Sequence, residues 1–146
     1  MLAHATCVAL RLRGRAWRGV LLRGPSGAGK SDLALRLIEA DGRLVADDQT
    51  RITRNGRTLL AAAPAALAGL IEVRGIGIVK LARGQLLSRA SLSLLVDLVP
   101  IDRIERLPEP AKEDLLGVRL PVLALAPFED SAVAKLRLAL MRIEAT

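Results

Sequence analysis

Short apolar segments of strand length alternate with turn residues along most of this chain, and only two stretches show helical periodicity. Residues 5–13 and 18–22 are strand-like and flank a turn at residues 14–17, which predicts a hairpin. Apolar residues recur at helical spacing over residues 31–39 and again over residues 130–143. The pattern therefore predicts a strand-rich α/β unit with two helices.

Further short apolar segments also predict strands. Asn55-Gly56 is the strongest turn signal among them and indicates a second hairpin. The predicted strands or strand pairs are 43–46, 49–60, 70–73, 92–99 and 117–126. Residues 61–68 indicate a connector or short helix and residues 100–115 a loop, while Pro121 indicates an edge or an interruption in the last strand.

A glycine-rich segment between the second strand and the first helix matches G-x-x-x-x-G-K-[ST], the phosphate-binding P-loop. It consists of Gly24, Pro25, Ser26, Gly27, Ala28, Gly29, Lys30 and Ser31. Its glycines permit backbone angles that let successive N–H groups face phosphate oxygens, and the helix N-terminus adds partial positive charge. Lys30 can reach the β- and γ-phosphates, and the Ser31 hydroxyl can ligate Mg²⁺. In this context the motif predicts binding of a nucleoside triphosphate rather than a glycine-rich surface turn.

Acidic residues occur in or just after two of the predicted strands. Asp47 and Asp48 follow strand 43–46, at the end where α/β folds bind phosphates. We expect Asp47 to support a metal ion and Asp48 to take a proton from an attacking hydroxyl, although an ordinary polar turn would look similar. Glu72 and Arg74 alternate along strand 70–73 and beyond, so both should project from one face. Glu72 is thus either a second metal ligand or an isolated edge-strand acid.

Composition narrows the class of protein. The chain has 146 residues, of which 51% are hydrophobic and 1% aromatic, so the core must be aliphatic. The net charge is +7, but the arginines are scattered and stacking aromatics are scarce, so nucleic-acid binding ranks low. No apolar run approaches the ~20 residues of a membrane helix, and the first ten residues lack the features of a signal peptide. We expect one cytoplasmic domain over residues 1–146.

The single cysteine and the single histidine have different expected surroundings. Cys7 cannot form an internal disulfide, and its apolar strand predicts a small core residue rather than a nucleophile. His4 is expected at the open end of the first hairpin, where a lone histidine is usually just solvated.

Four of these segments resemble, in the same order, the catalytic domain of HPr kinase/phosphorylase: residues 4–8, 24–31, 43–48 and 70–78. The last, Leu-Ile-Glu-Val-Arg-Gly-Ile-Gly-Ile, is similar to that family's signature and is more specific than a P-loop. The resemblance implies a P-loop fold related to the nucleotide site of phosphoenolpyruvate carboxykinase, with a mixed strand-rich sheet and few helices. It also implies ATP- and Mg²⁺-dependent phosphorylation of a serine on a small HPr-like phosphocarrier protein of a bacterial phosphotransferase system.

The same resemblance implies roles for single residues around the phosphates. His4 becomes a site residue near the transferred phosphate. The pair Asp47 and Asp48 supplies the catalytic acid/base, and Glu72 joins Ser31 around Mg²⁺.

The resemblance also implies contacts with the protein substrate. Arg74, Gly75 and Gly77 fall in the signature segment that meets the phosphocarrier. Arg106 resembles a later active-site arginine of the family, at a different spacing. Members of the family suggest a homo-oligomer, a hexamer.

The chain departs from the family pattern in three places. Family members usually carry an extra N-terminal domain, whereas this chain is expected to start at the catalytic domain. The family's arginine- and glycine-rich segment before the last helix, linked to dephosphorylation, is replaced by residues 126–131. The C-terminal helical tail is also short. This compact form resembles those of alphaproteobacteria; it predicts kinase activity and puts phosphorylase activity in doubt.

Two other functions remain open at this point. A small-molecule kinase is one, because residues 24–31 also resemble the guanylate-kinase loop, although no substrate-binding insertion or arginine-bearing lid is present. A non-catalytic ATP-binding regulator is the other. The presence of Lys30 with both Asp47 and Asp48 argues against it, because a regulator without catalysis has no need of a base.

Overall fold

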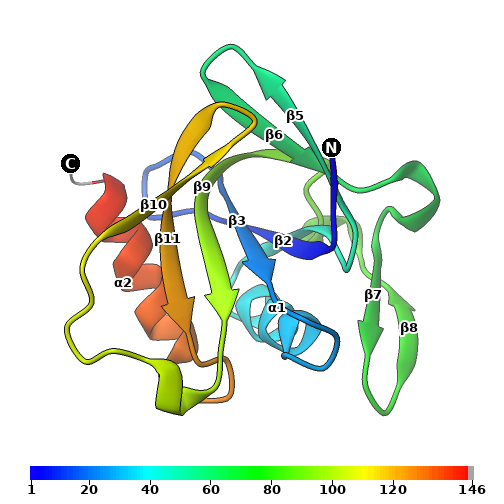
Figure 1. Ribbon diagram of the computed structural model, residues 1–146. Coiled ribbons are helices and arrows are strands. Elements are labelled where there is room, and N and C mark those ends of the chain that lie inside the picture. The colour runs from blue at the N-terminus through cyan, green and yellow to red at the C-terminus, as the bar shows by residue number, and fades with distance from the viewer. Residues whose placement is uncertain (145–146) are drawn as a thin grey trace.

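The centre of the protein is one mixed sheet, described by a computed structural model over residues 1–144 (Figure 1). Its strands are β1 (Leu2–Ala3), β2 (Ala5–Leu10), β3 (Arg18–Arg23), β4 (Arg43–Ala46), β5 (Thr50–Asn55), β6 (Thr58–Ala62), β9 (Arg89–Leu98), β10 (Ala111–Leu115) and β11 (Val118–Leu125). The remaining elements are the separate hairpin β7 (Leu70–Val73) and β8 (Gly77–Lys80), the helices α1 (Lys30–Glu39) and α2 (Ala132–Glu144), and the short 3₁₀ turns η1 (Ala65–Leu67), η2 (Arg83–Gln85) and η3 (Ile101–Arg103).

Strand β9 joins the two halves of the sheet. It runs parallel to β3 and β11 and antiparallel to β6. The carboxyl ends of β3, β9 and β11 therefore lie on one edge, where α/β folds bind ligands (Figure 1). Strand β2 lies antiparallel between β3 and β4, with Ala5 opposite Arg23 and Cys7 opposite Ala46. The start of β2 is thereby brought to the ends of β3 and β4.

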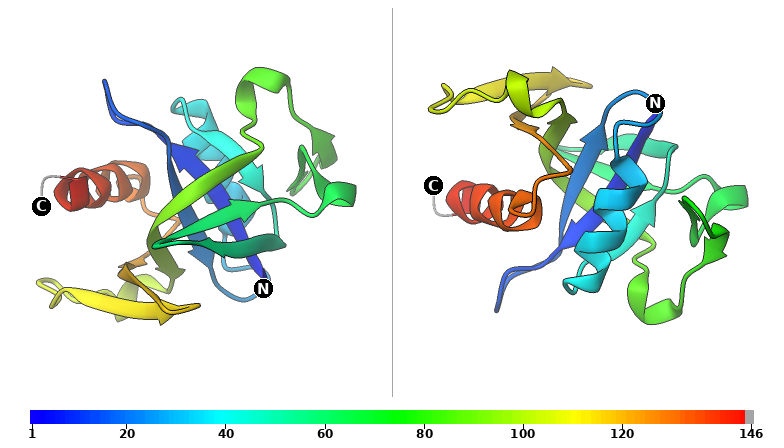
Figure 2. Two further views of the ribbon diagram at one scale, coloured as in Figure 1. Left: turned by 90° about the horizontal axis from the view of Figure 1, so that it is seen from above. Right: turned by 90° about the horizontal axis from the view of Figure 1, so that it is seen from below.

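Apolar side chains fill both faces of the sheet, because successive residues of a strand point to opposite faces. Both helices cover one face, where Leu33 and Leu37 of α1 and Leu136 and Leu140 of α2 are fully buried. The two helices lie on one side of the sheet, and β10 forms an edge of the sheet beside β11 (Figure 2). The second face contains Cys7, and burial raises the pKa of its thiol to about 12. The prediction that Cys7 is a core residue is confirmed.

Most of the predicted elements are confirmed. The hairpins β2–β3 and β5–β6 form at the predicted turns. The closing helix faces the core with the four residues expected from its period, which are Val133, Leu136, Leu140 and Ile143. Within the described residues no helix has the length and apolar character needed to cross a membrane.

Two expectations need correction, and the one for Pro121 is confirmed. The first strand ends at Leu10 rather than continuing to residue 13. Residues 100–115 are not wholly a loop, because 111–115 form β10 against β11. Pro121 lies inside β11 opposite Lys112, one residue before pairing with β9 begins at Val122. Pro121 thus lies where β11 pairs with β10 alone, at an edge of the sheet, as expected.

Candidate active site

The P-loop connects the end of β3 to α1, and its glycines are needed for two different reasons. Gly27 and Gly29 have φ values of 85° and 100°, in the left-handed region that favours glycine. Gly24 does not adopt positive φ, contrary to expectation. A Cβ at Gly24 would lie 2.8 Å from the Cβ of Ala28, so space and not backbone angle requires glycine there.

Lys30 is folded back across the loop. Its Nζ donates to the carbonyl oxygens of Gly24, at 2.6 Å, and Pro25, at 3.2 Å, and the residue is buried. These neutral acceptors hold the ammonium within the concave side of the loop. Phosphate oxygens are stronger acceptors for it, because the hydrogen bond is then between two charged groups.

Asp47 and Asp48 follow β4 and have different surroundings. Asp47 is buried, and its Oδ1 accepts from the hydroxyls of Ser31, at 2.7 Å, and Thr6, at 3.0 Å. Its Oδ2 accepts from the backbone N–H of Glu72, at 2.9 Å. The Asp47 carboxylate thus ties together the P-loop, β2 and β7.

Asp48 faces the open side of the site. Its Oδ1 lies 2.7 Å from Nε2 of His4, and both side chains are about half exposed. Its backbone N–H donates to Oγ1 of Thr6 at 3.0 Å. Asp48 has a φ of 65°, a conformation that costs of order 1–3 kcal/mol in a residue with a side chain. The contacts with Thr6 and His4 hold this strained residue in place.

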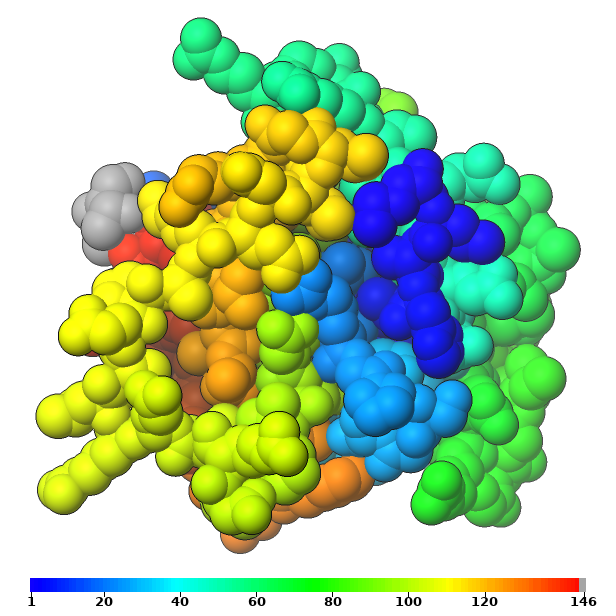
Figure 3. Space-filling model, viewed as in Figure 1, coloured from blue at the N-terminus to red at the C-terminus, as the bar shows by residue number. Residues whose placement is uncertain are grey.

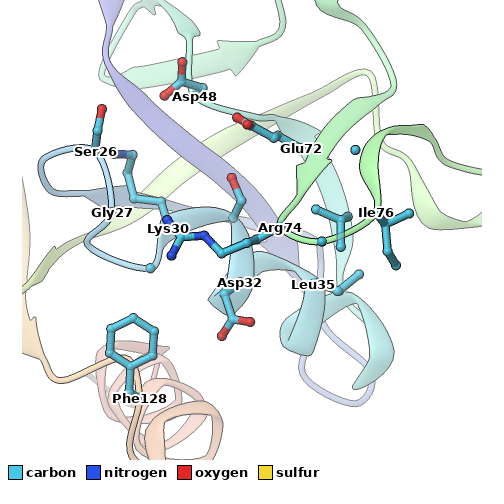
Figure 4. Close-up of a pocket in the computed structure, with 15 residues that line it drawn as sticks. Ser26, Gly27, Lys30, Asp32, Leu35, Asp48, Glu72, Arg74, Ile76 and Phe128 are labelled. Carbon is cyan, nitrogen blue, oxygen red and sulfur yellow. The ribbon is translucent and has the colours of Figure 1, made fainter.

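A cavity of about 630 Å³ brings most of the predicted residues together. Figure 4 shows Glu72 and Arg74 pointing into it from the β7–β8 hairpin, toward the P-loop residues. The cavity is lined by Ser26, Gly27, Gly29, Lys30, Ser31, Asp32, Leu35, Asp48, Glu72, Val73, Arg74, Gly75, Ile76, Gly77 and Phe128. The P-loop lies at the molecular surface, with the hairpin (green) on one side of it (Figure 3). A phosphate chain on the P-loop would therefore face Asp48 and the hairpin turn.

The donors proposed for Mg²⁺ are oxygen atoms of Ser31, Asp47 and Glu72. Mg²⁺ prefers oxygen ligands and is usually held by one or two carboxylates together with waters and substrate phosphates. The described residues contain no cluster of three or more His, Cys, Asp or Glu side chains that could hold a metal on their own. Two carboxylates and one hydroxyl beside a phosphate site fit a magnesium ion that arrives with the nucleotide.

Arg106 is the predicted site residue that the structure leaves apart. It is exposed and does not line the cavity, so its catalytic role stays a prediction. Conversely, Thr6 was not predicted although it touches both acids. All residues of β2 are buried, so the hydroxyl of Thr6 needs a hydrogen-bond partner there. This need is the signal by which Thr6 could have been identified.

Arg23 forms a second polar network directly before the P-loop. Its guanidinium donates to both carboxylate oxygens of Asp97 on β9, at 2.8 and 3.1 Å, and to both of Glu113 on β10, at 2.6 and 2.9 Å. These hydrogen bonds with Glu113 raise the pKa of Arg23 above its usual value, and the bond to Arg23 lowers the pKa of Glu113. The network fixes the residue from which the P-loop departs.

Comparison with known proteins identifies the protein family. A family model described as the HPr Serine kinase C-terminal domain matches residues 4–139. The chain belongs to this family.

Individual relatives agree with that assignment. The chain is 38% identical over 116 residues to an HPr kinase/phosphorylase of Geobacillus thermodenitrificans, covering 73% of this chain and 38% of the relative. It is 43% identical over 115 residues to an HPr kinase/phosphorylase of Acidovorax sp., covering 72% and 36%. This chain thus matches little more than a third of the length of these curated relatives.

A solved structure shows the same fold. The structure of the Hpr(Ser) kinase/phosphatase from Coxiella burnetii superposes with a TM-score of 0.85, covering 99% of this chain and 93% of that one. Its sequence is 23% identical. This likeness confirms the predicted α/β fold, a mixed strand-rich sheet with few helices.

Proposed function

We propose that this domain transfers the γ-phosphoryl group of Mg²⁺-ATP to a serine hydroxyl of a small HPr-like phosphocarrier protein. One observation carries the proposal. A single cavity contains a P-loop, the half-exposed carboxylate of Asp48, and a hairpin turn that bears Arg74. Family membership and the names of the relatives support the same reaction.

The reaction follows from the positions of these groups. The P-loop N–H groups and Lys30 bind the phosphate chain and stabilise the charge that moves toward the leaving β-phosphate. Asp48 accepts the proton of the serine hydroxyl, whose oxygen forms the new bond to the γ-phosphorus as the bond to the β–γ bridging oxygen breaks. ADP and phosphoserine are the products. His4, at 2.7 Å from Asp48, orients the carboxylate toward the cavity.

Mg²⁺ would be held by Ser31 and Glu72, with Asp47 supporting the site. Bound metal neutralises charge on the β- and γ-phosphates. Asp47 already accepts three hydrogen bonds, so it acts best by orienting the Ser31 hydroxyl and the backbone of Glu72.

The protein substrate would approach over the β7–β8 turn. Arg74 lines the cavity, and Gly75 and Gly77, with φ values of 88° and 115°, form the turn beside it. Ile76 between them is 77% exposed, which suits contact with a partner. The serine would then reach Asp48 from the open side of the cavity.

The kinase direction is proposed without the phosphorylase reaction, because residues 126–131 replace the arginine- and glycine-rich segment that the resemblance links to dephosphorylation. We also propose a cytoplasmic homo-oligomer, a hexamer, from the same resemblance. Large exposed apolar side chains such as Leu107 and Leu138 are compatible with contacts between copies.

The test is to incubate the protein with Mg²⁺, γ-labelled ATP and an HPr-like phosphocarrier, and to map the modified residue by mass spectrometry. Label on one carrier serine supports the proposal. Label on small alcohols instead of the carrier would indicate a small-molecule kinase. ATP binding without any transfer would indicate a regulator. Light scattering on the same sample measures the oligomeric mass.

A further inference from the structure

The segment between β11 and α2 places an aromatic ring beside the P-loop. Phe128 is one of only two aromatic residues in the chain and is 69% exposed. One side of the ring packs on the loop: a Cβ at Gly29 would lie 2.9 Å from its Cζ, and 3.2 Å from Cγ of Pro127. Most of the ring is left uncovered, at the rim of the phosphate cavity (Figure 4).

Phe128 is also where two hollows meet. A second hollow of about 320 Å³ shares Phe128 and Asp32 with the phosphate cavity. Its other lining residues are Arg36, Glu129, Asp130 and Val133. A ligand whose phosphates bind in the P-loop can therefore extend past the ring, so that its remaining part enters the second hollow.

The second hollow is unsuited to more phosphate. Three acids line it, Asp32, Glu129 and Asp130. Lys135 pairs with Glu129 at 2.9 Å and Arg36 with Asp32, so neither cation is left as a free positive charge that would attract an anion. Arg36 is engaged with its own neighbours, since it donates to Asp32 at 3.1 Å and to the carbonyl of Pro127. An uncharged, flat group with amino donors suits both the open ring and the carboxylate acceptors.

We propose that this second hollow binds the nucleobase of the nucleoside triphosphate, with the base stacked on Phe128. Stacking of a base on an aromatic side chain is sequence-tolerant and contributes substantially to affinity. The nearby carboxylates accept from an exocyclic amino group, as adenine presents. The P-loop would thus supply the affinity for phosphate, and residues 126–133 the preference for a nucleotide.

This inference rests on the proposed function, so its test uses two probes that share the phosphate site. The affinities of Mg²⁺-ATP and of Mg²⁺-tripolyphosphate, which has no base, are measured by calorimetry. Three forms of the full chain are compared: the natural protein, Phe128→Leu and Phe128→Tyr. Leucine keeps an apolar contact with Gly29 but cannot stack, whereas tyrosine keeps the ring.

We expect Phe128→Leu to weaken ATP binding by about 5- to 150-fold, the range that base stacking gives, while tripolyphosphate affinity is unchanged. Phe128→Tyr should bind both probes like the natural protein. Equal losses for ATP and tripolyphosphate in Phe128→Leu would show that the ring only supports Gly29, and would overturn the inference. Unchanged ATP affinity in that variant would overturn it as well. If the natural protein binds neither probe, the proposed function itself fails.

Discussion

At the scale of single residues, Thr6 is the link between the two acids. Its hydroxyl donates to the Asp47 carboxylate and accepts from the backbone N–H of Asp48, and the residue is fully buried. One hydroxyl therefore positions both the buried acid that supports Ser31 and the strained acid that faces the cavity. Burial makes this link costly to remove, because an unsatisfied buried polar group costs about 1–3 kcal/mol.

Replacing Thr6 tests whether it positions the acids. Thr6→Val keeps the shape of the side chain. It removes the acceptor of the Asp48 N–H and one of the two hydrogen bonds to Oδ1 of Asp47. We expect kcat for carrier phosphorylation to fall about 10- to 100-fold, with a smaller change in KM for ATP. Thr6→Ser keeps the hydroxyl and should restore most of kcat. If Thr6→Val keeps its activity and Thr6→Ser loses it, methyl packing and not the hydroxyl is what matters.

Substitutions of Asp48 and Asp47 are expected to impair different properties, the first phosphoryl transfer and the second magnesium binding. Asp48→Asn removes the proposed base, so phosphorylation should fall about 10²- to 10⁴-fold while Mg²⁺-ATP still binds. Asp47→Asn places an amide NH₂ against Ser31, Thr6 or the Glu72 N–H, all of which donate to Asp47. That variant should weaken magnesium-dependent binding. Single-turnover rates and a magnesium titration separate the two effects, and the reverse pattern would exchange their roles.

Residues with local patterns could be predicted, and those with distant partners could not. The P-loop, Asp47, Asp48 and Glu72 each carry a spacing or strand-end signal. Phe128 carries none, because the position of its ring depends on how α2 returns past Gly29. Arg106 was predicted from a local resemblance and does not line the cavity, so its role stays a prediction.

At the scale of elements, the β7–β8 hairpin is hydrogen-bonded as its own two-stranded sheet and is tied to the site through the Glu72 N–H and Asp47. We expect Arg74→Ala to raise KM for the phosphocarrier at nearly constant Mg²⁺-ATP affinity, the pattern of lost uniform binding. Arg83→Ala, in η2 and outside the cavity, is the matched control. A loss of ATP affinity in Arg74→Ala would place this arginine with the nucleotide.

The network of Arg23, Asp97 and Glu113 gives β10 a measurable role. Arg23 lowers the pKa of Glu113 from its usual 4.5, so the interaction stabilises the fold above pH 4.5 and is lost as pH falls below it. Both side chains are partly exposed, so the contribution is about 1 kcal/mol or less. Glu113→Gln should lower the free energy of unfolding at pH 7.

A control variant and a pH series show whether the lost stability of Glu113→Gln comes from charge or from packing. Asp114→Asn alters a neighbouring acid of β10 and should leave stability nearly unchanged. The difference between Glu113→Gln and the natural protein, measured by urea unfolding, should shrink below pH 4.5. A difference that is constant with pH would mean that packing, and not charge, is lost.

Strand β10 also shows why some elements escape prediction. Its sequence, Ala-Lys-Glu-Asp-Leu, is mostly charged and has no alternating apolar face. It is a strand because a two-residue turn at Leu116-Gly117 pairs it with β11 and because Arg23, far away in the sequence, binds Glu113. The β5–β6 hairpin was predicted and confirmed because Asn55-Gly56 is a strong turn signal, whereas Leu116-Gly117 beside a charged strand is not.

At the scale of the whole molecule, the site is assembled from segments far apart in sequence. Residues 4–6, 24–32, 47–48, 72–77 and 128 meet at one edge of the sheet. The antiparallel course of β2 brings the first of these to the ends of β3 and β4. The long strand β9 then connects this half of the sheet to β6 and β11. A ligand in the cavity would therefore contact segments that are far apart in the sequence: residues 26–35, 48, 72–77 and 128.

Because of this arrangement, the nucleotide should stabilise the fold as a whole. A ligand that binds only the folded state stabilises it by RT ln(1 + [L]/Kd), about 2.7 kcal/mol at a hundred times Kd. For a domain of this size, that corresponds to a rise in Tm of about 5–10 °C. We expect this rise with Mg²⁺-ATP in scanning calorimetry and none in Lys30→Ala, which has lost the buried ammonium of the P-loop. An equal rise in Lys30→Ala would mean that ATP binds outside the P-loop.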